Sequence, residues 1–121
     1  MNYNDNNIFA KILRGEIPCK KIYEDDFVLS FYDINPQKKI HALVIPKGKY
    51  RDLDDFSNKA STDEMAGLLK GINTVAKKLG ISVDTGRGYR ALTNISEDGG
   101  QEVPHLHFHL FGGEKVGKMV T

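Results

Sequence analysis

One stretch near the C-terminal end, residues 104–111, limits the possible folds most, because histidines and apolar residues alternate along it. Successive side chains of a β-strand point to opposite faces of the sheet, so strict alternation is typical of a half-buried strand. One face is expected to carry Leu106, Phe108 and Leu110 toward a core. The other face is expected to carry imidazoles about 6–7 Å apart along the strand. These imidazoles belong to His105, His107 and His109.

The remaining hydrophobic pattern predicts an α+β fold with a largely antiparallel sheet. A short helix is expected over residues 8–13, with Asp5 or Asn6 as its N-cap and Gly15 at its end. A long amphipathic helix is expected to begin at a capping box on Ser61. The expected apolar face of this helix comprises Met65, Leu68, Leu69, Ile72, Val75, Ala76 and Leu79. Further strands are expected over residues 21–24, 27–33, 40–45 and 89–95.

Length and charge narrow the class of protein. A chain of 121 residues has the usual size of one domain, so we expect a single domain over residues 1–121. Its 17 basic and 16 acidic residues are interspersed, which gives no reason to expect nucleic acid or a membrane as partner. The single cysteine, Cys19, fits a reducing compartment. The polar start of the chain does not resemble a signal peptide, so the expected location is the cytoplasm.

Three roles are open to the clustered imidazoles. A polar face in contact with water is the simplest, although threonine, lysine or glutamate would serve such a face equally well. Two histidines at positions i and i+2 of a strand can also bind one zinc ion, with His41 or Glu102 as a further ligand. In phosphoryl chemistry, one imidazole attacks phosphorus while its neighbours bind the phosphoryl oxygens or donate protons. Repulsion between like charges would help to keep one imidazole neutral and nucleophilic near pH 7.

Residues outside the alternating stretch favour phosphoryl chemistry. The adjacent Gly99 and Gly100 precede the histidines and are expected to expose backbone N–H groups, which suit a phosphate and not a metal ion. Asp33 ends an aromatic strand and offers a carboxylate to a ribose diol, although aspartate is also common before an Asn-Pro turn. Phe9 and Phe31 are candidates for the lining of a base pocket. Together these residues favour a nucleotide as the ligand.

The segment from His105 to Phe111 resembles the histidine triad motif, His-φ-His-φ-His-φ-φ, in which φ is an apolar residue. Most of the remaining chain resembles the nucleotide-binding (Hint) branch of the histidine triad (HIT) family. The matching segments are residues 8–12, 16–18, 23–26, 31–36, 41–47 and 88–101. This resemblance implies a five-stranded antiparallel sheet with one short and one long helix. It also implies a homodimer in which two sheets join into one larger sheet.

The resemblance also implies an activity: hydrolysis of purine nucleoside phosphoramidates or acyl-nucleotides through a nucleotidyl-histidine intermediate, without a metal ion or other cofactor. By position, His107 is the nucleophile, His105 orients it and His109 contacts the phosphoryl oxygens. His41 is expected to have a supporting part. The residues expected to bind the nucleotide are Ile8, Phe9, Phe31, Asp33, Ile34, Asn94, Gly100 and Glu102.

Two features depart from the pattern of the family. Residues 7–10 read Asn-Ile-Phe-Ala where many bacterial members carry Cys-Ile-Phe-Cys as half of a structural zinc site, so that zinc site is not expected. Glu102 stands where some members have a serine that assists the leaving group, which leaves its role open. The alternative functions are a dinucleoside polyphosphate hydrolase of the same superfamily and a nucleotide-binding adaptor with incidental activity.

Overall fold

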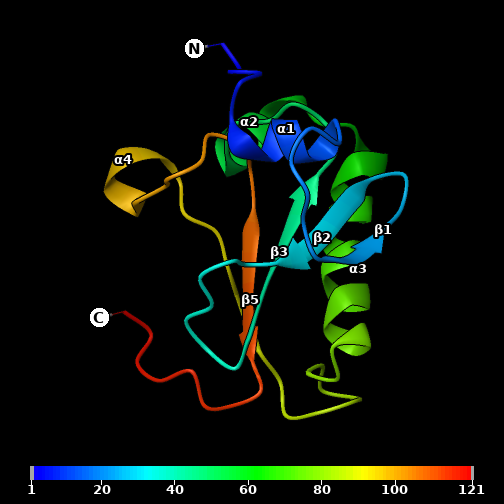
Figure 1. The fold of residues 1–121 in the computed structure, drawn as a ribbon, viewed down its shortest axis with the longest axis vertical. Coiled ribbons are helices and arrows are strands. Elements are labelled where there is room, and N and C mark those ends of the chain that lie inside the picture. Colours follow the sequence, from blue (N-terminus) through cyan, green and yellow to red (C-terminus); the bar gives the residue numbers. More distant parts are fainter. Residues whose placement is uncertain (1, 121) are drawn as a thin grey trace.

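Residues 2–120 are described by a computed structural model, in which helices pack around a five-stranded antiparallel sheet (Figure 1). The strands are β1 (Lys21–Glu24), β2 (Val28–Tyr32), β3 (Ile40–Pro46), β4 (Arg90–Leu92) and β5 (Phe108–Gly112). The helices are α1 (Ile8–Leu13), α2 (Leu53–Lys59), α3 (Thr62–Lys78) and α4 (Ser96–Gly99). The order across the sheet is β1-β2-β3-β5-β4, and every neighbouring pair is antiparallel. This arrangement confirms the α+β fold with a five-stranded antiparallel sheet.

The central strand β3 is buried along nearly its whole length, as its mostly apolar sequence predicts. It forms a hairpin with β2 and pairs with β5 on its other side. Because side chains alternate along a strand, Ala42 and Val44 join one apolar cluster while Leu43 and Ile45 join another. His41 shares the face of Leu43 and Ile45. The histidine face of the sheet is therefore also a buried face.

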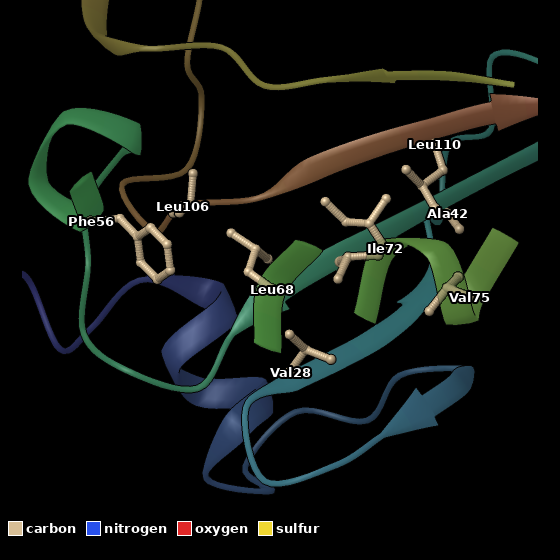
Figure 2. Close-up of a cluster of buried hydrophobic side chains, with 9 residues drawn as sticks. Val28, Ala42, Phe56, Leu68, Ile72, Val75, Leu106 and Leu110 are labelled. Carbon is tan, nitrogen blue, oxygen red and sulfur yellow. The ribbon is translucent and has the colours of Figure 1, made fainter. Parts of the chain in front are cut away.

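Helix α3 covers one face of the sheet (Figure 1). Gly67 and Gly71 allow its close approach to β2. A Cβ atom on Gly67 would lie 2.4 Å from the ring of Phe27, and one on Gly71 would lie 2.8 Å from Val28. Figure 2 shows how side chains from this helix, from α2 and from the sheet meet in one cluster. Its buried members are Val28, Ala42, Val44, Phe56, Leu68, Ile72, Val75, Leu106 and Leu110.

The opposite face of the sheet carries a second apolar cluster, to which helix α1 contributes. Phe9 of α1 meets Phe31 of β2 edge to face, with 5.6 Å between the ring centroids. The buried members of this cluster are Phe9, Leu29, Phe31, Leu43 and Ile45. Helix α1 thus covers the same face on which His41 lies.

The helices differ from the expectation in a few respects. Asn7, and not Asp5 or Asn6, is the N-cap of α1, because its side chain accepts a hydrogen bond from the Ala10 N–H at 2.9 Å. Leu69 of α3 is 68% exposed and lies outside the buried face of the helix. That buried face includes Gly67 and Gly71, which the apolar pattern does not predict. The predicted capping box of α3 is present, and α2 and α4 are additional short helices. None of the helices within residues 2–120 is long and apolar enough to cross a membrane.

The last two strands are shorter than the alternating pattern predicts. β5 begins only at Phe108, and the residues before it form an irregular segment. His105 and His107 lie in this segment and are almost fully buried, so they do not form a solvated strand face. β4 has three residues and stops well before the expected end at Ile95. The chain then turns at Ser96, whose φ of +56° is rare for a residue other than glycine.

Candidate active site

Four histidines meet on the sheet face opposite α3. His41 lies on β3 and His109 on β5, with 5.2 Å between their ring centroids. His107 precedes β5, and its ring centroid lies 5.1 Å from that of His109. His105 is fully buried two residues earlier. The fold therefore brings the three alternating histidines together with a fourth one from the neighbouring strand.

Hydrogen bonds determine which nitrogen of His41 and His109 carries the proton. The backbone N–H of Gln37 donates to Nδ1 of His41 at 3.2 Å, so the neutral ring carries its proton on Nε2. This Nε2–H donates to Nδ1 of His109 at 2.9 Å. His109 must then carry its own proton on Nε2. That N–H can donate to an oxygen of a ligand.

His107 is held with its Nδ1 proton engaged. Its Nδ1–H donates to the backbone carbonyl of His105 at 2.7 Å, which leaves the lone pair of the neutral ring on Nε2. The hydroxyl of Thr93 donates to the backbone carbonyl of His107 at 2.7 Å. The ring of Phe9 meets that of His107 edge to face, with 4.9 Å between centroids. Both the backbone and the ring of His107 are therefore fixed by contacts.

His105 acts on its neighbour through its backbone and not through its ring. Nε2–H of the buried ring donates to the carbonyl of Pro46 at 2.8 Å, because a carbonyl oxygen can only accept. Nδ1 of the same ring accepts from the hydroxyl of Tyr3 at 2.5 Å. The carbonyl of His105 is the acceptor that orients His107. The backbone carbonyl of His105 can therefore provide the orienting role expected of this residue.

Burial keeps the imidazoles neutral near pH 7. Removal from water lowers the pKa of His105 and that of His109 to about 4, with repulsion from neighbouring histidines as a smaller cause. Burial also lowers the pKa of His107 and of His41, although the nearby Asp33 carboxylate acts in the opposite direction. The sequence suggested mutual repulsion as the source of neutrality, whereas the structure makes burial the larger cause.

Asp33 has the turn role that its position in the sequence left open, and its contact with a ribose diol stays a prediction. Its Oδ1 accepts a hydrogen bond from the N–H of Asn35 at 2.8 Å, which is the turn contact expected before Asn-Pro. Its Oδ2 lies 3.4 Å from Nε2 of His41, and the side chain is 20% exposed. The turn therefore presents a carboxylate at the edge of the histidine cluster, where a ligand can reach it.

Asp33, His41 and His109 are the residues to consider as metal ligands, because their ligand atoms lie within 4.8 Å of one another. A histidine that binds metal through one nitrogen normally donates the other ring N–H to an acceptor. His41 has the opposite surroundings, because its Nδ1 faces the N–H of Gln37. Binding a metal through Nε2 would set an Nδ1–H against that N–H. The donor pattern of these residues therefore does not fit a metal ion.

The apolar residues expected around a base differ in exposure. Phe9 and Phe31 are buried and contact each other, and Phe9 also contacts His107. Ile8 is 41% exposed and Ile34 is 86% exposed, so both present apolar surface to solvent. Phe9 and Phe31 therefore belong to the core beside the histidines, and base binding by these four residues stays a prediction.

One of the two glycine N–H groups expected to bind phosphate, in the loop between β4 and β5, is already engaged within the loop. The N–H of Gly100 donates to the carbonyl of Glu97 at 3.1 Å, so it is not the free donor that the sequence suggested. Gly100 ends α4 with a φ of +76°, a conformation that favours glycine. The side-chain amide of Gln101 ties this loop down by donating to the carbonyls of Arg51 at 2.6 Å and Val103 at 2.9 Å.

Two further expected residues lie in or beside this loop. Asn94 is half-buried just after β4, and its part in binding the sugar and phosphate stays a prediction. Glu102 is exposed, and its negative charge raises the pKa of His107 against the effect of burial. Glu102 is therefore close enough to His107 to affect the protonation of its ring.

Among the residues that contact the histidine segment or its loop, the sequence did not predict a role for Tyr3, Thr93 or Gln101. Thr93 had a detectable signal, because its expected strand was the natural partner of the histidine strand. Tyr3 had none, since it lies 102 positions from His105 and no local pattern reports such a contact.

Comparison with known proteins agrees with the fold and the motif. The HIT domain family model matches residues 14–116. An uncharacterised 13.2 kDa HIT-like protein of Azospirillum brasilense is 54% identical over 119 residues, which are 98% of this chain and 95% of that protein. A HIT family hydrolase from Clostridium thermocellum has a TM-score of 0.85 at 36% identity, over 98% of this chain and 99% of the other. A histidine triad nucleotide-binding protein from Candida albicans has a TM-score of 0.75 at 34% identity, over 87% and 73% of the two chains. With matches over most of its length, this chain belongs to the HIT domain family.

Proposed function

We propose that this HIT protein is a nucleotide-binding hydrolase that cleaves purine nucleoside phosphoramidates or acyl-nucleotides through a nucleotidyl-histidine intermediate. The observation that carries the proposal is the orientation of His107, whose Nδ1–H is held on the carbonyl of His105 at 2.7 Å. A neutral imidazole with a free Nε2 lone pair is the form that attacks phosphorus. Relatives named as HIT family hydrolases support the reaction class.

The proposed reaction has two displacement steps at phosphorus. In the first, the Nε2 lone pair of His107 attacks the α-phosphorus, and the bond to the amine or acyl oxygen breaks with its electrons leaving on that group. A leaving amine takes a proton from solvent. In the second step, water attacks phosphorus and gives up a proton to solvent, the P–N bond to His107 breaks with its electrons returning to Nε2, and a nucleoside monophosphate leaves. Nε2–H of His109 donates to a phosphoryl oxygen in both steps and stabilises its charge.

Recognition of the nucleoside is assigned to groups beside the histidines. Oδ2 of Asp33 is proposed to accept hydrogen bonds from the ribose diol, since Oδ1 is used in the turn. The N–H of Gly100 is left out, because the carbonyl of Glu97 already accepts from it. The remaining proposed contacts to base, sugar and phosphate come from Ile8, Phe9, Phe31, Ile34, Asn94 and Glu102.

Turnover of an adenosine phosphoramidate by His107→Ala tests the proposed function. We expect this variant to lose measurable turnover because it lacks the attacking nitrogen. Its affinity for a nucleoside monophosphate should stay within about tenfold of the wild-type value, because the ribose and base contacts remain. Undiminished turnover by the variant would contradict the proposal.

A dinucleoside polyphosphate hydrolase is the second candidate, and one observation favours it. Glu102, which stands at the position that the family resemblance links to the leaving group, is exposed, so this side of the site places little restriction on the size of that group. Rates on an adenosine phosphoramidate and on a diadenosine polyphosphate separate the two candidates. A faster reaction with the polyphosphate would favour the second one. Nucleotide binding without turnover of either compound would instead favour the adaptor role.

The proposal places the protein in the Hint branch of the family and treats it as a cytoplasmic homodimer. β4 is the last strand in the sheet order, so a second copy can extend the sheet at that edge. Sedimentation velocity should then give twice the 13.5 kDa mass of the chain. A monomer would remove the dimer from the proposal and leave the chemistry at His107 intact.

A further inference from the structure

We propose that Tyr3 is a positioning residue of the active site, which holds the middle histidine through the ring of His105. The N-terminal segment before α1 thereby becomes part of the site. The effect on turnover rests on the proposed function, whereas the effect on the His105 ring does not depend on it.

The contact between Tyr3 and His105 can run in only one direction. The Tyr3 oxygen lies 2.5 Å from Nδ1 of His105, and the two rings meet edge to face at 5.6 Å between centroids. Because Nε2–H of His105 donates to the carbonyl of Pro46, Nδ1 of the neutral ring has a lone pair and no proton. The Tyr3 hydroxyl must therefore be the donor. Partial burial raises the pKa of this hydroxyl, which keeps its proton in place.

The path from Tyr3 to the middle histidine passes through a single residue. His105 precedes β5, so the hydrogen-bond ladder of the sheet does not hold it. Its backbone is held outside the sheet by two hydrogen bonds, from its own N–H to the Val103 carbonyl at 2.9 Å and from the Leu106 N–H to the Tyr50 carbonyl at 2.8 Å. Its ring is held at both nitrogens, by Tyr3 on one side and by Pro46 on the other. Its carbonyl accepts the Nδ1–H of His107 at 2.7 Å. Releasing the ring of His105 should therefore loosen the acceptor that orients His107.

Contacts within the N-terminal segment explain how Tyr3 reaches this position. The Asp5 carboxylate lies 2.8 Å from Nζ of Lys49, which follows β3. The guanidinium of Arg14 donates to the carbonyl of Asp5 at 2.8 Å. The Asn7 side chain donates to the carbonyl of Asn4 at 2.7 Å. The segment is thus fastened to α1 and to the residues that follow β3.

Tyr3→Phe removes the hydroxyl and keeps the ring, so it tests the proposal with little disturbance of packing. Tyr23→Phe is the matched control, because it also removes one tyrosine hydroxyl. That hydroxyl donates to the Asp25 carboxylate at 2.8 Å and does not contact the histidines. Two measurements apply to the full chain. One is the ¹⁵N chemical shifts of the histidine rings, which report the protonated nitrogen of each ring. The other is kcat and KM for an adenosine phosphoramidate.

In the wild type and in Tyr23→Phe, we expect His105 to show a single form protonated on Nε2. In Tyr3→Phe, we expect the unprotonated Nδ1 of His105 to move to the ¹⁵N shift of a ring nitrogen that accepts no hydrogen bond, and kcat to fall about threefold to tenfold with KM unchanged. The same ¹⁵N shift for Nδ1 of His105 in Tyr3→Phe as in the wild type would overturn the proposal. An altered ring with unchanged kcat would overturn the link to His107. If the wild type turns over no phosphoramidate, the proposed function fails, and the ring measurement still decides the role of Tyr3.

Discussion

At the residue scale, the histidine cluster is defined by where each ring carries its proton. Backbone groups fix three of the four rings: the Gln37 N–H for His41, the Pro46 carbonyl for His105 and the carbonyl of His105 for His107. Backbone groups do not titrate in this range, so these assignments hold as long as the rings are neutral. The proton on His109 follows from its contact with His41. The cluster therefore presents one lone pair and one N–H donor to a ligand.

The acidic limb of the kcat/KM profile should have its midpoint below pH 6.5. His107 must be neutral to attack, and burial lowers its pKa from the ordinary value of 6.5. Protonation and loss of activity therefore begin at a lower pH than for a histidine in water. The profile should be measured with a phosphoramidate that does not itself titrate in this range. A midpoint at or above pH 6.5 would contradict the buried, neutral nucleophile.

Asp33→Asn should raise KM by about tenfold or more, because hydrogen bonds from a ribose diol to a carboxylate are stronger than those to an amide. The sharper comparison uses a substrate without the 2′-hydroxyl. Wild-type protein should discriminate against this substrate, and Asp33→Asn should discriminate much less. Equal discrimination by both proteins would show that Asp33 does not contact the ribose.

At the element scale, the close packing of α3 on β2 depends on glycines inside a helix. Gly67→Ala should lower the free energy of unfolding by about 1–2 kcal/mol, although alanine normally stabilises a helix relative to glycine. The reason is the added Cβ, which would lie 2.4 Å from the Phe27 ring. Asn73→Ala, at an exposed position of the same helix, is the control and should be neutral or slightly stabilising. Denaturant unfolding measures both, and a stabilised Gly67→Ala would disprove the close contact.

The elements that the sequence predicted well are those specified by neighbouring residues. Helix α3 starts at the expected capping box on Ser61, and β3 follows from its run of apolar residues. The start of β5 was placed too early, because the alternating pattern continues through His105 and His107 although side-chain contacts hold them. The loop at Gly100 was misjudged for a similar reason. Gly99 and Gly100 indicate a sharp turn, but they do not indicate which carbonyl accepts the hydrogen bond from the Gly100 N–H.

The same distinction, between what adjacent residues specify and what distant contacts specify, applies to the candidate site. The motif located the three alternating histidines, and the Asn-Pro turn located Asp33, because both are patterns of adjacent residues. The proton positions came from contacts between segments far apart in the chain, which no spacing encodes. The buried state of the histidine face also depends on α1, whose Phe9 packs against His107.

At the scale of the whole molecule, burying four neutral histidines makes stability depend on pH. The pKa of each is lowered in the folded state, to about 4 for His105 and His109. At a pH between about 4 and 6.5, the ordinary pKa of histidine in the unfolded chain, the unfolded state binds more protons than the folded state. The free energy of unfolding should therefore fall as the pH falls through this window.

His109→Gln provides the comparison for this pH dependence, because it removes one titrating ring and keeps a polar side chain. Its free energy of unfolding should decline less steeply than that of the wild type between pH 6.5 and about 4. Denaturant titrations at several pH values measure both slopes. Identical slopes would show that His109 is not the buried neutral group described above.

The central claim, that His107 forms a covalent bond to the nucleotide, is tested most directly in a single turnover. Protein in excess is mixed with an adenosine phosphoramidate, quenched under alkaline denaturing conditions that preserve a phosphorus–nitrogen bond, and digested for mass spectrometry. We predict one transient adenylyl group on the peptide that contains His107, located on that residue, and no adduct with His107→Ala. Complete conversion of the substrate without such an adduct, or an adduct on a different residue, would contradict the claim.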